Sequence, residues 1–156
     1  MLDRLLRVAS DLAALALAGV MLVTIADIAI KNIAGRPIAS TFEWVEIGLA
    51  AMVFLGFPRV FRNDGNVVVD VIDLIASKRT VGVLTTIGAV ATLGFLLLIG
   101  YAMIEPATDT VRYPEAKPES GVPLYWIWIP VLVGTALSIV GAALVLRDRL
   151  MRRGER

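Results

Sequence analysis

The sequence predicts an all-α integral membrane protein with four transmembrane helices, both termini in the cytoplasm and a short amphipathic helix in the cytoplasmic loop. Three observations lead to this fold class. Of the 156 residues, 58% are hydrophobic and 19% are charged, against about 45–50% and about 25% in an average soluble domain. The apolar residues are concentrated in long uncharged runs, and most basic residues fall on one side of those runs. We therefore expect residues 1–156 to form a single membrane domain.

The predicted spans cover approximately residues 8–31, 42–61, 80–104 and 121–146. A helix needs about 20 mostly apolar residues to cross a hydrocarbon layer of roughly 30 Å. The last two spans meet this length without a charged residue, whereas the first two contain shorter uncharged runs and carry charges near their ends. We read the first run as a span rather than a cleaved signal peptide, because it is long for a signal core and no small-x-small cleavage pattern follows it.

The orientation follows from the basic residues. Eleven of the 15 Lys and Arg residues lie in the termini and in the loop between the second and third spans. Short loops rich in Lys and Arg stay in the cytoplasm, so both termini are predicted to be cytoplasmic. Trp and Tyr favour the membrane–water interface, and five of them fall at the opposite, outer boundary: Trp44, Tyr101, Tyr125, Trp126 and Trp128.

Carboxylates open the second span. Ser40 and Glu43 have the spacing of a capping box, in which Glu43 reaches back to the Ser40 amide. Glu46 lies one turn deeper, where a carboxylate is costly unless it faces water, protein or a cation, and a contact with a partner is left open. Asp27, near the outer end of the first span, is predicted to pair with Lys31, four residues further on.

The cytoplasmic end of the second span is basic. Arg59 and Arg62 lie three residues apart, and their expected role is to fix topology and contact lipid phosphates. Residues 67–77 carry a polar stripe at helical spacing and are predicted to form the surface helix, with a buried extended run as the alternative. Asp70 or Asp73 on that stripe is expected to face a nearby arginine.

Two other segments suggest contact surfaces. Gly134, Ser138 and Ala142 recur at a spacing of four in the last span, and small residues at that spacing let membrane helices approach closely. Residues 105–119 are acidic and contain three prolines. They are predicted to form the outer loop, which is either a solvated connection or a docking surface for an outer partner.

Several function classes are disfavoured. The chain has no Cys and no His, which excludes thiol catalysis, disulfides and zinc sites built from those residues. It has no Gly-rich phosphate-binding loop and no charged residue midway through a span, where proton relays and ion sites usually need one. We therefore predict no catalytic residue, cofactor, metal or nucleic-acid partner.

The segment from 41 to 73 carries a resemblance to a known family. It reads TFEWVEIGLAAMVFLGFPRVFRNDGNVVVDVID, and with GVPLYWIWIPVLVG of the last span it resembles the small (Q-type, DctQ-like) membrane subunit of tripartite ATP-independent periplasmic (TRAP) transporters. In that family, paired acids open the second span, Phe-Leu-Gly follows, and Arg, Gly and Val-Asp occupy the cytoplasmic turn. The matching residues here are Glu43, Glu46, Gly56, Arg62, Gly65 and Asp70. Asn66 departs from the pattern, because many members carry His there.

The resemblance implies an accessory role in the bacterial inner membrane. In that family the large membrane subunit carries the substrate and sodium sites, and a periplasmic binding protein delivers an organic acid. The small subunit is expected to be a non-catalytic scaffold for the large subunit and to help dock the binding protein. Its contacts would be the lipid bilayer and those two partners, through a predicted interface of Glu43, Glu46, Arg59, Arg62, Asp70, Gly134, Ser138 and Ala142.

Two alternatives belong to other function classes. An autonomous ion-coupled transporter acting as a homodimer would need an essential carboxylate inside the first span. Asp27 and Glu46 are the only candidates, and both lie near the outer ends of their spans. A membrane enzyme is disfavoured because the chain lacks His, Cys and clustered carboxylates within its spans.

Overall fold

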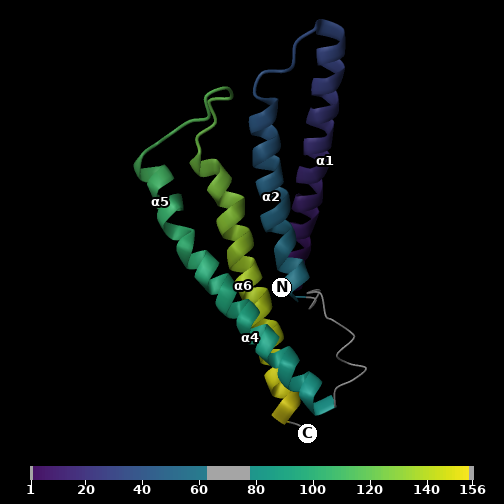
Figure 1. Ribbon diagram of the computed structural model, residues 1–156, viewed down its shortest axis with the longest axis vertical. Coiled ribbons are helices and arrows are strands. Elements are labelled where there is room, and N and C mark those ends of the chain that lie inside the picture. Colours follow the sequence, from purple (N-terminus) through teal and green to yellow (C-terminus); the bar gives the residue numbers. More distant parts are fainter. Residues whose placement is uncertain (1, 63–77, 155–156) are drawn as a thin grey trace.

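The computed structural model describes residues 2–62 and 78–154. It contains α1 (Leu2–Ala34), α2 (Thr41–Arg62), α4 (Lys78–Ala102), α5 (Ile104–Arg112) and α6 (Tyr125–Gly154) (Figure 1). Within these residues there is no strand beyond an isolated bridge between Ala116 and Pro123. Four helical segments are long and apolar enough to cross a membrane, which confirms the all-helical, four-span prediction. The predicted surface helix at 67–77, with Asp70, lies outside the described residues.

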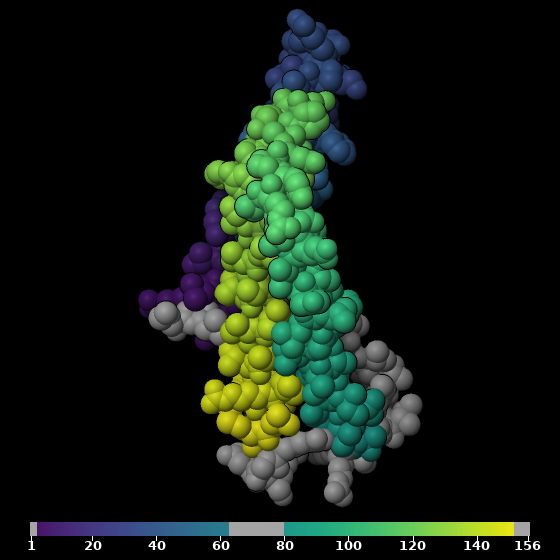
Figure 2. Space-filling model, turned by 90° about the vertical axis from the view of Figure 1, so that its left-hand side faces the viewer, coloured from purple at the N-terminus to yellow at the C-terminus, as the bar shows by residue number. Residues whose placement is uncertain are grey.

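The helices pack in the spatial order α1–α2–α6–α4, so the last helix of the chain lies between the second and the fourth. Figure 1 shows α1 and α2 as an antiparallel pair, with α4 crossing α6 and diverging from it toward α5. In the space-filling view, α6 and α4 lie side by side along the face toward the viewer (Figure 2). The beginning of α1 and the end of α6 point toward the same end of the molecule, as an even number of crossings requires.

The helices extend past the predicted spans. α1 begins at Leu2 and ends at Ala34, and α6 continues to Gly154, whereas the predicted spans were 8–31 and 121–146. The added turns contain mainly Arg and Leu, which are good helix formers. An uncharged run in the sequence therefore indicates only the part of a helix that can lie in the hydrocarbon layer. The helix extends beyond that run at one or both ends.

The prediction that 105–119 forms one outer loop is wrong for its first part. Residues 104–112 form α5, which follows α4 after a single non-helical residue. Backbone hydrogen bonds continue through the junction, from the Met103 amide to the Ile99 carbonyl at 3.0 Å and from the Ala107 amide to the Met103 carbonyl at 3.2 Å. Pro106 lies in the first turn of α5, where its missing N–H is not needed. The proline therefore does not prevent this helix from forming.

The small residues of α6 allow a close approach to α2. A Cβ atom placed on Gly134 would lie 2.0 Å from the carbonyl oxygen of Phe54, so the backbones of α6 and α2 touch there. Ser138 and Ala142, one and two turns further on, are 1% and 5% exposed. The Ser138 hydroxyl donates to the Gly134 carbonyl at 2.7 Å and so is satisfied within its own helix. The predicted close approach is confirmed, and α2 is its partner.

Most of the remaining apolar surface is uncovered. In the most apolar part of each candidate span, 39% of the residues of α6 are buried, against 6% in each of the other three. Membrane helices can expose apolar side chains because lipid tails are as apolar as leucine. The faces of α1, α2 and α4 are therefore available to lipid or to another membrane protein.

Candidate partner-binding site

A folded hairpin follows α5 and contacts the start of α2. The Lys117 amide donates to the Val122 carbonyl and the Leu124 amide to the Glu115 carbonyl, both at 2.9 Å. Gly121 turns the chain with a φ of +68°, a conformation that glycine adopts without steric cost. We call the contacts between this hairpin (residues 113–124) and residues 40–46 the α2 clasp.

Glu43 is the centre of the α2 clasp. It is 6% exposed, and its two carboxylate oxygens accept the backbone amides of Glu119 at 3.1 Å and Ser120 at 2.8 Å. The predicted capping box is wrong, because the Ser40 amide donates to Glu119 Oε2 at 3.0 Å instead of to Glu43. The two glutamates thus exchange roles across the clasp: Glu119 caps α2, and Glu43 holds the hairpin.

Glu46 forms an ion pair with Lys117 of the hairpin. Its Oε2 atom lies 2.5 Å from Nζ of Lys117. The lysine side chain is 14% exposed and the glutamate side chain 47%, so the pair lies at the edge of the clasp rather than in a buried core. A carboxylate at the membrane boundary needs a cation, protein or water, and the hairpin supplies the cation.

Asp27 fixes the connection between α1 and α2. Its Oδ1 atom accepts the Ile38 amide at 2.7 Å and the Thr41 hydroxyl at 3.1 Å. The predicted pair with Lys31 is wrong: no such ion pair occurs within residues 2–62 and 78–154. Two neutral donors from the returning chain occupy the carboxylate in its place.

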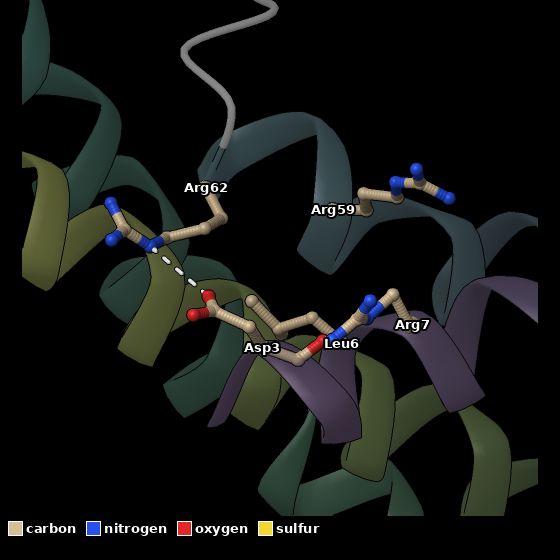
Figure 3. A pocket seen from close by; sticks show the side chains of 5 residues that line it. All are labelled: Asp3, Leu6, Arg7, Arg59 and Arg62. Carbon is tan, nitrogen blue, oxygen red and sulfur yellow. Dashed lines mark hydrogen bonds and ion pairs between the residues drawn. The ribbon is translucent and has the colours of Figure 1, made fainter. Parts of the chain in front are cut away.

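The opposite end of the bundle carries a basic pocket of about 210 Å³ between the start of α1 and the end of α2 (Figure 3). We call it the arginine pocket, and it is lined by Asp3, Leu6, Arg7, Arg59 and Arg62. Arg62 Nη1 lies 3.2 Å from Asp148 Oδ2, and Arg62 Nε lies 4.0 Å from Asp3 Oδ1. Arg62 therefore joins the end of α2 to both α6 and α1.

An apolar groove of about 570 Å³ lies between α5 and α6, on the clasp side of the bundle. Its walls are Ile104, Ala107, Thr108, Val111, Arg112 and Leu132. The groove has the chemistry to accept an apolar side chain or a lipid tail. No group of three or more acidic, His or Cys side chains that could hold a metal occurs within the described parts of the chain.

The structure brings the predicted site residues together in three places. Glu43 and Glu46 join the α2 clasp, Arg59 and Arg62 the arginine pocket, and the small residues of α6 the contact with α2, whereas Asp70 lies outside the described residues. Sequence reasoning missed four charged residues that complete these contacts, namely Asp3, Lys117, Glu119 and Asp148. Asp148 alone gave a local signal, as the only acid in the basic segment 147–153. A role of these sites in binding partners stays a prediction.

A family model matches most of the chain. The family model described as tripartite ATP-independent periplasmic transporters, DctQ component, matches residues 20–152. This range begins within α1 and ends within α6, so it spans the α2 clasp, the contact between α2 and α6, and the end of α2 that carries Arg59 and Arg62. No curated protein matches the chain.

Proposed function

This chain belongs to the DctQ family and is a small membrane subunit of a TRAP transporter, and from that premise we propose that it is a non-catalytic scaffold. It packs against the large membrane subunit and helps to dock a periplasmic substrate-binding protein during ion-coupled uptake of an organic acid. Substrate and ion would pass through the large subunit, and this chain would enlarge its fixed part in the membrane.

One observation carries the proposal. The ionisable residues that could have served transport lie at helix ends and are engaged by their own chain, as at Glu43, Glu46 and Asp27. The apolar faces of α1 and α4, in contrast, are uncovered, with Leu22 68% and Leu98 66% exposed. A chain with an internally satisfied polar framework and open apolar faces is suited to packing against a larger membrane protein. The same observation gives no reason to propose an autonomous transporter, because its two candidate carboxylates already hold the fold together.

The proposed orientation places both termini in the cytoplasm of the bacterial inner membrane. Eleven of the 15 basic residues then lie on the cytoplasmic side, in agreement with the positive-inside rule. In this orientation the α2 clasp faces the periplasm. Because Glu43 and Glu46 hold the hairpin at two points, it would present a fixed surface to the binding protein.

Co-expression with the large subunit tests the scaffold. We expect the two chains to co-purify as one species, and proteoliposomes containing both, with the binding protein, to take up substrate. Liposomes with this chain alone should not. Absence of a stable complex, together with full transport by the large subunit and binding protein alone, would refute the proposal.

The control for docking is a matched pair of charge changes. Glu115→Lys alters the exposed hairpin surface, whereas Lys31→Glu alters the end of α1 at the same side of the membrane. We expect Glu115→Lys to reduce uptake at limiting binding protein while the membrane complex still forms. Equal effects of the two changes would contradict a specific role of the hairpin.

A further inference from the structure

The arginine pocket has more positive charge than its own carboxylates neutralise. Arg62 is engaged by Asp148 at 3.2 Å and lies 4.0 Å from Asp3. Arg7 donates from Nε to the backbone carbonyl of Asp3 at 3.2 Å. Neither Arg7 nor Arg59 has a carboxylate within 4.0 Å in the part of the chain that the structure describes. Two guanidinium groups therefore border one pocket without a counter-charge from those residues.

The residues that line the pocket carry the donors that a phosphate group needs. Figure 3 shows Arg7 turned back toward the first turn of α1, while Arg59, which also lines the pocket, extends from α2 away from Asp3 and Arg62. Leu6 also lines the pocket and is 3% exposed, so the pocket has an apolar wall beside its arginines. Arginine offers several N–H donors in a planar fork and binds phosphate oxygens in pairs.

The surroundings of the pocket favour a ligand with an apolar tail. The pocket lies at the ends of two helices that are long and apolar enough to cross a membrane, which is the depth of phospholipid headgroups. The neighbouring turns expose apolar side chains, with Val8 and Leu12 of α1 54% and 49% exposed and Val60 of α2 45% exposed. A free phosphate ion would leave these side chains uncovered, whereas the acyl chains of a lipid would cover them.

We propose that the arginine pocket binds the phosphate of one anionic phospholipid, with Arg7 and Arg59 as its direct ligands. Basic pockets between membrane helices on the cytoplasmic side bind acidic headgroups by this chemistry. The lipid would bridge the start of α1 and the end of α2. It would thereby supply the negative charge that Asp3 alone does not.

Lipid binding to the purified full chain in neutral detergent tests this proposal. Native mass spectrometry counts the lipids retained during titration with phosphatidylglycerol, with phosphatidylcholine, and with inorganic phosphate as competitor. We expect one phosphatidylglycerol per chain, weaker retention of phosphatidylcholine, and no displacement by phosphate. Arg59→Gln and Arg7→Gln should each lower the affinity for phosphatidylglycerol about fivefold, the factor expected for one basic residue at an acidic lipid surface.

Arg4→Gln is the matched control, because Arg4 lies in the same turn of α1 but does not line the pocket. It should leave the affinity unchanged, and a loss equal to that of Arg59→Gln would overturn the proposal in favour of diffuse attraction. Asp3→Asn should raise the affinity, which a misfolded variant would not do, and no gain would count against the site. Displacement of the lipid by inorganic phosphate would show that the ligand is the free anion and would overturn the lipid assignment.

Discussion

Replacing Gly134 by alanine is expected to separate α2 from α6 and to destabilise the helix bundle. The added Cβ would lie 2.0 Å from the carbonyl oxygen of Phe54 and 2.4 Å from its carbonyl carbon. Backbone atoms cannot rotate away as a side chain can. Because real Cβ atoms are essentially never closer than 3.0 Å to such a neighbour, one helix must move by about 1 Å, and a gap of that size weakens every contact along the interface.

The size of the effect follows from two opposing contributions. Overpacking a close-packed interface costs about 1–3 kcal/mol, and the shift also disturbs the buried Ser138 and Ala142 further along α6. Alanine offsets part of this cost, since it is favoured over glycine within a helix by up to about 1 kcal/mol. We expect a net loss of about 1–2 kcal/mol in the free energy of unfolding.

Unfolding of the purified protein by sodium dodecyl sulfate, followed by the loss of α-helical circular dichroism, measures this change. Gly94→Ala is the matched control, because nothing lies within 4 Å of a Cβ placed at Gly94 in α4, and it should leave stability unchanged or raise it. If Gly134→Ala and Gly94→Ala unfold at the same detergent concentration, the backbone contact between α2 and α6 does not determine stability and the reasoning fails.

Three further predictions concern the charged contacts. Glu43→Gln should speed hydrogen exchange of the Glu119 and Ser120 amides, which donate hydrogen bonds to the Glu43 carboxylate. Unchanged exchange rates would show that the carboxylate does not hold the hairpin. Reversing the charge of Glu46 or of Lys117 singly should loosen the hairpin, and reversing both should restore it. The double-mutant cycle should give a coupling free energy of about 0.2–1 kcal/mol that decreases at high salt. Additive effects of the two changes would contradict the ion pair. Arg62→Glu should lower the yield of folded protein from membranes by bringing like charges together, and adding Asp148→Arg should recover most of it, whereas equal yields from all variants would argue against this contact.

The sequence was sufficient for the spans because their signal is local. A run such as 80–104 is uncharged and long enough to cross a bilayer, and no knowledge of neighbouring helices is needed to recognise it. The small residues beginning at Gly134 also predicted a close approach. They could not identify α2 as the partner, because small residues permit contact with any helix that presents a complementary surface.

The contacts at the helix ends could not be predicted from local sequence. The Glu43 carboxylate and the Ser120 amide are 77 positions apart. The residues around Glu43 do not indicate whether its carboxylate accepts from an amide of its own helix end or from one far along the chain. α5 was missed because proline and charged residues between 104 and 112 resemble a loop by composition. The helix forms nonetheless, since Pro106 lies in the one turn where proline is tolerated.

The placement of α6 between α2 and α4 has a consequence for biosynthesis. The ribosome delivers α1 and α2 first, and these neighbours can pair as soon as both have entered the bilayer. α4 follows, but its main neighbour is α6, which is made last. α4 therefore lacks this neighbour until the final helix inserts beside it. A chain that stops before Tyr125 would contain the α1–α2 pair and α4 with α5, without the helix that joins them.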